Sequence, residues 1–274
     1  MGKALECLCG FATAPGTTPT NLTMAIGNSL TIRNAPLTSL PLLLAVWTNQ
    51  FGAGVLRIKS PRLHDNVQGV RLNTLALNPN ALWPLGITQK LVPQDTLTED
   101  LTGSATAGKI ESAFNLIYYP DCPGIAARLA SPADVLSRMA NIVGVEIDCN
   151  PGAGGGWTGA RALNYSYDLL KANTDYALLG YIPSVNCGAV RFTGVDTGNV
   201  GVAGPGNITL PGLTSRWFLE LSEKLGLPLV PILNSANRAG ISVDVSQDQA
   251  ATAVNVTAIL AEIGSSPSAT QLGT

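Results

Sequence analysis

A single histidine limits the acid–base chemistry that this sequence could perform. The histidine, His64, is followed directly by Asp65. Neighbouring residues of a strand point to opposite faces, so Asp65 is not placed to orient the imidazole ring as the acid of a catalytic triad does. The sequence also lacks the G-x-S-x-G motif that presents a nucleophilic serine. We therefore predict that His64 faces solvent in a loop and that the chain is not an enzyme.

A glycine-rich segment, residues 151–161, is the next place where chemistry could occur. It contains a formal G-x-G-x-x-G pattern at Gly154, Gly156 and Gly159. Such a pattern holds a pyrophosphate where a helix begins directly after it, and a phosphate-binding loop also needs a lysine. The sequence provides neither, so we predict a flexible connector and no nucleotide cofactor.

The cysteines and acidic residues could bind metal ions. The chain has five cysteines, and this odd number in a chain of 274 residues predicts reduced thiols that pack as small apolar side chains. Cys7 and Cys9 form a C-x-C pair that could bind a metal or cross-link, but no second Cys/His pair lies nearby, so we predict no zinc site. Acidic residues that could hold structural calcium between subunits do not have EF-hand spacing, so we expect no cofactor and leave calcium as an alternative. These acidic residues are Asp95, Glu99, Asp100, Asp244 and Asp248.

The composition favours β-structure. Only 12% of the residues are charged and 46% are hydrophobic, with 29 glycines and 18 prolines, which is typical of short strands joined by tight turns. This small number of charged residues cannot cover the surface of an isolated globular protein. We therefore expect part of the surface to be buried against neighbouring chains. A net charge of −2 provides no basic surface for nucleic acid. We found neither an apolar run long enough to span a bilayer nor a secretory leader, and we expect synthesis as a soluble protein in a cytoplasm.

An internal repeat organises the sequence. Residues 84–119 align without a gap to residues 228–263 at a constant offset of 144, with matching alternation of apolar and polar residues. Residues 45–58 resemble residues 179–192 at an offset of 134. The offset grows where the second copy contains its clearest predicted helix, residues 214–226. The chain therefore contains two similar β-rich copies.

Each copy contains about eight strand-like segments. They run from Ser29 to Tyr119 in the first copy and from Ala162 to Ile263 in the second, and a short helix that begins after Ser131 separates the copies. We predict an all-β chain of two tandem eight-stranded antiparallel jelly rolls with a few short helices. The predicted parts are an N-terminal arm (1–20), a first jelly roll (21–130), a linker with a short helix and a strand (131–150), a second jelly roll (151–263) and a C-terminal tail (264–274).

On this duplication and pattern, the sequence resembles the double jelly-roll major capsid proteins of tailless, membrane-containing icosahedral bacteriophages. The resemblance covers residues from about 22 to 263 and includes no signature motif. It implies a homotrimer whose six jelly rolls form a pseudo-hexagonal capsomer, and capsomers that tile an icosahedral virion shell. The implied partners are neighbouring trimers, minor capsid or penton proteins, and possible contact of the N-terminal arm with an underlying viral membrane. The expected location is the virion, after synthesis in the host cytoplasm.

Three aromatic residues in predicted loops and strands are candidate interface anchors between chains: Trp83, Trp157 and Tyr181. Their alternative role is to fill the core of the chain itself. The alternative function is a lectin-like or receptor-binding β-sandwich protein of a virion or cell surface, since jelly rolls also host binding sites. That function requires a polar, aromatic-lined pocket at one end of a sandwich.

Overall fold

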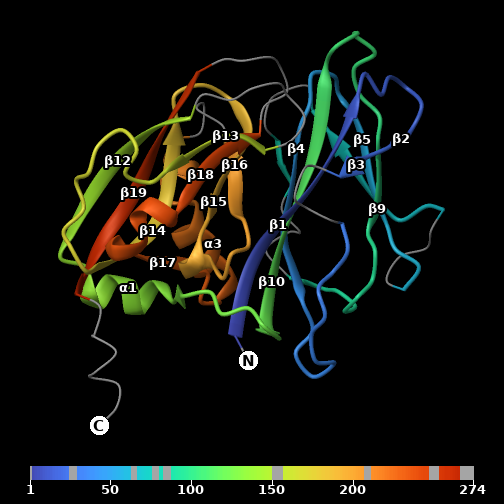
Figure 1. Ribbon diagram of the computed structural model, residues 1–274. Helices are drawn as coiled ribbons and strands as arrows, with labels where there is room; N and C mark the ends of the chain where they lie inside the picture. Colours follow the sequence, from blue (N-terminus) through green and yellow to red (C-terminus); the bar gives the residue numbers. More distant parts are fainter. Residues whose placement is uncertain are drawn as a thin grey trace.

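Strands in four antiparallel sheets make up most of the chain, as the computed structural model shows (Figure 1). The all-β prediction is confirmed in this coarse form. The structure describes residues 2–24, 30–62, 67–75, 80–82, 88–149, 157–206, 211–246 and 253–265. His64, Asp65, Trp83, Gly154, Gly156, Asp248 and the predicted tail beyond Ser265 lie outside these ranges.

The first half of the chain forms two sheets. Sheet I has the order β3-β1-β10-β4-β7, with β8 also paired to β4, and sheet II has the order β2-β9-β5-β6. The strands of sheet I are β1 (Gly2–Thr13), β3 (Thr23–Met24), β4 (Leu42–Asn49), β7 (Asn80–Leu82), β8 (Gln89–Lys90) and β10 (Ile110–Cys122). The strands of sheet II are β2 (Thr20–Asn21), β5 (Gly54–Lys59), β6 (Val70–Thr74) and β9 (Thr98–Leu101).

The second half forms two more sheets. Sheet III has the order β11-β17-β14-β19-β12, and sheet IV has the order β13-β18-β15-β16. The strands of sheet III are β11 (Leu129–Ala130), β12 (Asn141–Cys149), β14 (Thr174–Pro183), β17 (Val230–Asn234) and β19 (Val254–Ser265). The strands of sheet IV are β13 (Trp157–Ala162), β15 (Cys187–Thr193), β16 (Val202–Gly206) and β18 (Ser242–Ser246).

Short helices accompany the second half: α1 (Pro132–Arg138), α2 (Pro211–Thr214), α3 (Trp217–Leu225) and the 3-10 turns η1 (Val195–Thr197) and η2 (Ser235–Gly240). Both predicted helices are present, but helix α3 begins at Trp217 and not at residue 214, and its N-cap residue Arg216 makes no capping hydrogen bond through its side chain. The Ser131 hydroxyl accepts a hydrogen bond from the Asp134 backbone N–H at 3.2 Å, as an N-cap does. Helix α3 ends at Gly226, whose φ of 65° suits a residue without a Cβ.

The segment predicted as an N-terminal arm is instead a long buried strand. Residues 2–13 form β1, which pairs with β10 along its whole length, from Gly2 opposite Cys122 to Thr13 opposite Ile110. The prediction of an unstructured arm is wrong because the small residues of this segment fit a strand that is buried on both faces. Likewise, β12 in the predicted linker pairs with β19 and is an edge strand of sheet III.

The pairing of strands repeats between the halves at the offsets found in the sequence. Phe114 lies opposite Trp47 in sheet I, and Ala258 lies opposite Tyr181 in sheet III. Strands β9 and β18 begin 144 residues apart, at Thr98 and Ser242, as do β10 and β19. The sequence repeat is therefore also a repeat of the sheets.

The two halves differ in which faces of their larger sheets, sheet I and sheet III, are covered by other parts of the chain. The side of sheet I that carries Ala113 and Ile117 packs against sheet II, while the side that carries Phe114 packs into the core of the second half. In sheet III the side that carries Ala258, the equivalent of Phe114, packs against its own partner, sheet IV. Helix α1 and part of α3 cover the other side of sheet III. Strands β1, β4 and β10 of sheet I are thus buried on both faces, and the two halves share one core.

Candidate functional site

Four aromatic side chains from both halves form the seam of the molecule. Trp47 of β4 stacks on Phe114 of β10 with ring centroids 5.2 Å apart. Trp157 of β13 contacts Phe114 edge-on at 5.8 Å, and Trp217 of α3 contacts Trp47 edge-on at 5.9 Å. Trp47 Nε1 also donates a hydrogen bond of 3.0 Å to the Gly188 carbonyl oxygen of β15. The contacts of Trp157 with Phe114, of Trp217 with Trp47 and of Trp47 with Gly188 join the two halves. The stacking of Trp47 on Phe114 holds these two rings together on the first-half side.

Tyr181 lies deep in the second half, between sheets III and IV. Its side chain is fully buried, and its hydroxyl donates to the Pro205 carbonyl oxygen at 3.0 Å. Burial raises the pKa of Tyr181 well above its usual value, so the hydroxyl stays protonated. A Cβ on Gly204 would lie 2.4 Å from the Tyr181 hydroxyl oxygen and 2.5 Å from the Trp217 ring, so only glycine fits there.

The three predicted anchors have different positions. Trp157 is 7% exposed and Tyr181 is fully buried, so within one chain both fill the core, which was their alternative role. Trp83 lies outside the described residues. Contact of these residues with neighbouring chains stays a prediction. The structure also brings Trp47 and Trp217 to the seam, which sequence reasoning missed, although the alignment of Trp47 with Tyr181 was a signal that both are buried.

Cys7 and Cys9 lie on the same face of β1, against the second half. Both thiols are fully buried, and burial raises the pKa of each thiol far above its usual value. A thiol that does not ionise is a poor metal ligand and a poor nucleophile. The other three cysteines are also buried, which confirms their predicted role as small core residues.

An arginine–aspartate pair occurs at the same place in each half. In sheet II, Arg57 binds Asp100 with both ends of its guanidinium, at 2.6 and 2.9 Å. In sheet IV, Arg191 binds Asp244 in the same way, at 2.9 and 2.6 Å. Burial opposes ionisation of both carboxyls. Arg57 and Lys59 together still hold the pKa of Asp100 below its usual value, whereas burial outweighs Arg191 and raises the pKa of Asp244.

One acidic side chain in the core of the first half has no such counterion. Glu99 of β9 is 1% exposed, and neither its carboxylate oxygens nor the amide atoms of Asn115 have a hydrogen-bond partner among the described residues. Burial raises the pKa of Glu99 to about 7, with a smaller opposing effect from the Asn115 amide. The equivalent positions in the second half are Val243 and Ile259. The polar pair therefore belongs to the first half alone.

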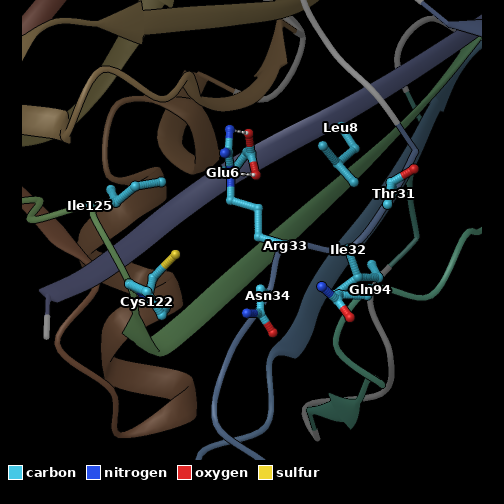
Figure 2. Close-up of a pocket in the computed structure, with 10 residues that line it drawn as sticks. Glu6, Leu8, Thr31, Ile32, Arg33, Asn34, Gln94, Cys122 and Ile125 are labelled. Atoms are coloured by element: carbon cyan, nitrogen blue, oxygen red, sulfur yellow. Dashed lines mark hydrogen bonds and ion pairs between the residues drawn. The ribbon is translucent and has the colours of Figure 1, made fainter.

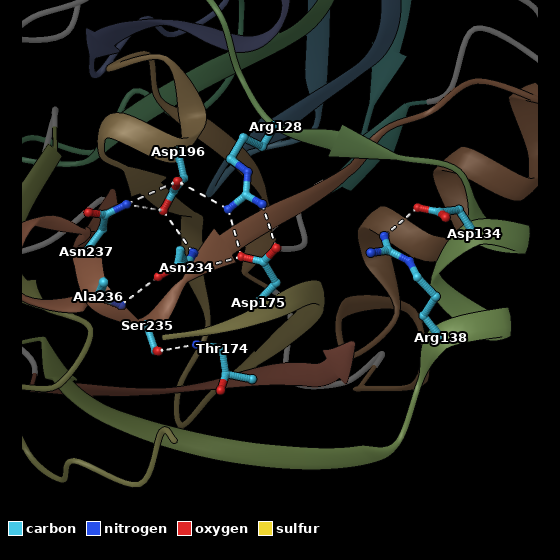
Figure 3. Close-up of polar contacts among 10 residues, drawn as sticks. All are labelled: Arg128, Asp134, Arg138, Thr174, Asp175, Asp196, Asn234, Ser235, Ala236 and Asn237. Carbon is cyan, nitrogen blue, oxygen red and sulfur yellow. Dashed lines mark hydrogen bonds and ion pairs between the residues drawn. The ribbon is translucent and has the colours of Figure 1, made fainter. Parts of the chain in front are cut away.

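A polar network binds Arg128, which lies in the connector between β10 and β11, to the second half (Figure 3). Arg128 donates to both carboxylate oxygens of Asp175 at 2.9 and 2.6 Å and lies 3.7 Å from Asp196. Asn234 donates to Asp175 at 2.8 Å through its amide and to Asp196 at 2.9 Å through its backbone N–H. Burial opposes ionisation of Asp175, but Arg128 and Asn234 hold its pKa below the usual value.

A pocket of about 540 Å³ opens beside β1, between residues 31–34 and the chain that follows β10 (Figure 2). Its main polar feature is the ion pair of Glu6 and Arg33, with contacts of 2.7 and 2.5 Å. Because Arg33 occupies both Glu6 oxygens, the pair neutralises the wall of the pocket. The residues that line the pocket include no aromatic ring.

The candidate calcium ligands do not gather into one site in the part of the chain that the structure describes. Asp100 and Asp244 bind arginines, and Asp95 accepts hydrogen bonds from the Ser60 hydroxyl and the Thr96 backbone N–H. Among the described residues, no group of three or more histidine, cysteine or acidic side chains could hold a metal ion. No helix in this described part of the chain combines the length and the apolar character that crossing a membrane requires.

Comparisons with known proteins give distant likenesses. No family model matches the sequence, and no curated protein matches it. Among solved structures, the chain is similar to the PBSX exported protein XepA, with 10% identity over 93% of this chain and 86% of that one, at a TM-score of 0.28. It is also similar to the major capsid protein P2 from Bacteriophage PM2, with 9% identity over 95% of this chain and 97% of that one, at a TM-score of 0.25. At these TM-scores neither likeness carries a conclusion about fold or function.

Proposed function

We propose that this chain is a structural protein of a virion shell, built from two tandem jelly rolls. The strand orders support this proposal. Within the first half, β1-β10-β4-β8 and β2-β9-β5-β6 are neighbours, and within the second half β12-β19-β14-β17 and β13-β18-β15-β16 are neighbours. If the short strands β3, β7 and β11 are left out and the remaining eight strands of each half are numbered along the chain, both halves have the orders 1-8-3-6 and 2-7-4-5. These orders support a jelly roll, an architecture used by capsid proteins.

The observation that carries the proposal is the repeated register of the two halves. Arg57 opposite Asp100 in sheet II corresponds to Arg191 opposite Asp244 in sheet IV. Duplication of whole sandwiches, down to paired residues, has a clear use in a tile. Two similar units in each of three chains give six near-equivalent sides, which cover a surface more evenly than three.

The remaining parts of the proposal follow from this assembly. Three chains form a pseudo-hexagonal capsomer, and capsomers meet one another and minor capsid or penton proteins in an icosahedral shell. The low charge content of 12% suits flanks that are buried between chains. The chain acts without catalysis, cofactors or direct contact with nucleic acid, is made in the host cytoplasm and is located in the virion. An underlying membrane is a further possible partner, but β1 is part of sheet I and is not available as an arm to reach it.

The test is the mass of the purified protein by light scattering, followed by negative-stain imaging of the same sample. We expect a stable species of three chain masses with hexagonal outlines, or closed shells. A monomer at every concentration and salt tested contradicts the proposal and favours the lectin-like or receptor-binding alternative. No observation in the described structure favours that alternative at present, since the pocket beside Glu6 lacks the aromatic lining that it requires.

A further inference from the structure

The outer face of sheet II, which points away from its core, carries an unbalanced row of charges. One row of residues crosses the four strands of this sheet, and each residue lies directly opposite the next: Asn21, Asp100, Arg57 and Arg71. Lys59 also binds Asp100, at 2.6 Å. Among the described residues of this face, three cations thus face one carboxylate, and two arginines are direct cross-strand neighbours, an arrangement that a further anion would stabilise.

The equivalent face in the second half is already a contact surface. Arg191, the counterpart of Arg57, lies over the Trp157 ring at 4.4 Å, and Trp157 contacts Phe114 of the first half. The Arg191 side chain is 15% exposed, whereas that of Arg57 is 28% exposed. The equivalent face of sheet II is less covered, since Arg71 is exposed and Arg57 is 28% exposed, although Lys59 and Asp100 beside them are largely buried.

A surface of opposite charge lies at the other end of the molecule. On β12, the edge strand of sheet III, Ile142, Gly144, Glu146 and Asp148 share one face, and all four are exposed. Ile142 is 53% exposed. In Figure 1, β12 lies at the left edge and sheet II at the right. Two acidic residues beside an exposed isoleucine are opposite in sign and equal in number to the surplus of two cations on sheet II.

We propose that the outer face of sheet II in one copy docks on the β12 face of a second copy. This inference rests on the proposed assembly and names its contact surfaces. Because the two faces differ and lie on opposite sides of the folded molecule, the contact is heterologous and can close into a ring. Charge pairing across it provides register and a faster encounter between copies.

Charge reversal tests the contact with exposed residues. Arg71→Glu alone removes the surplus of two cations from the sheet II row and places a carboxylate at its exposed end, and Glu146→Lys together with Asp148→Lys makes both faces positive. We expect each change to raise the concentration needed for half-association by at least about tenfold, in sedimentation equilibrium at low salt. In the chain that carries all three changes, the carboxylate at position 71 faces the two lysines at positions 146 and 148, so this chain should associate better than the chain with the two lysine changes alone. Lys90→Glu, on an exposed strand of sheet I, is the matched control and should leave association unchanged.

The outcomes separate this inference from the proposed function. If the unaltered chain assembles but the variants assemble equally well, or if the combined variant associates no better than the chain with the two lysine changes alone, the docking faces are wrong while the shell role stands. If the unaltered chain is monomeric throughout, both fail. Circular dichroism of each variant must match that of the unaltered chain for the association data to be compared. We expect this match because Arg71 and Asp148 are exposed, so their replacement leaves the core intact.

Discussion

Replacing Glu99 by glutamine should stabilise the protein, relative to the unaltered chain, more at neutral pH than at acidic pH. The carboxyl of Glu99 is buried without a counterion, and its pKa is about 7 in the folded chain against an ordinary value of 4.5. The folded state therefore binds this proton more tightly than the unfolded state does. Stability is retained at low pH and is lost as the pH rises from about 4.5 to about 7, because ionisation in the core has no compensating partner.

The magnitude follows from the two pKa values. One pKa unit corresponds to about 1.4 kcal/mol, so the charged form of Glu99 costs about 3 kcal/mol of unfolding free energy at pH 8 and about 1 kcal/mol at pH 5. Glu99→Gln removes this dependence, since the amide does not titrate. The variant should gain about 2 kcal/mol relative to the unaltered chain between pH 5 and pH 8, whatever its constant cost from an unpaired amide.

Urea unfolding at a series of pH values measures this difference directly. Tryptophan fluorescence reports the seam, and the midpoints give the free energy when the slopes agree. Glu223→Gln, in an exposed part of α3, is the control and should follow the unaltered chain. If the difference between Glu99→Gln and the unaltered chain is the same at pH 5 and pH 8, Glu99 is not a buried titrating group in solution and the reasoning fails.

Three further predictions test the seam, the connector and the thiols. Trp47→Ala should destabilise the chain by about 3 to 5 kcal/mol in urea unfolding, because it opens a cavity between the halves, and a loss below about 1 kcal/mol would mean that the halves do not share a core. Arg128→Ala leaves Asp175 buried without its counterion and should cost about 2 kcal/mol at pH 7, less than a fully buried pair because Arg128 is partly exposed. This cost should shrink as the pH falls and Asp175 is protonated, so a pH-independent loss would contradict it. The five cysteines should resist a thiol reagent in the folded protein and react after denaturation, and rapid labelling of the folded chain would show that they are not buried.

The repeated strands could be predicted from the sequence because their alternation survives duplication. Strands β9 and β18, and β10 and β19, begin at positions that keep the offset of 144. Helix α1 was recognisable from Ser131 and the proline after it, since caps are local signals.

The parts that escaped prediction depend on contacts far apart in the chain. β1 consists of small, mostly uncharged residues and becomes a strand through β10, about 100 residues later. Both sides of β10 are apolar, with Phe114 on one and Ile117 on the other, so the sequence does not say which side meets sheet II. Nor could a single sequence reveal that Glu99 and Asn115 lie in one core, because each resembles an ordinary surface residue of a strand.

The double burial of sheet I bears on how the protein is made. Once residue 122 has left the ribosome, β1 can pair with β10, and the first half has all its strands. The side of sheet I that carries Cys7, Trp47 and Phe114 stays uncovered until residues 157–217, which include Trp157 and Trp217, have been synthesised. Until then the nascent chain presents a broad apolar surface, the kind that draws chaperones or aggregates. A fragment that ends after β10 should therefore be insoluble even though its own sheets are complete, and the two halves are a repeat in pattern but one unit in folding.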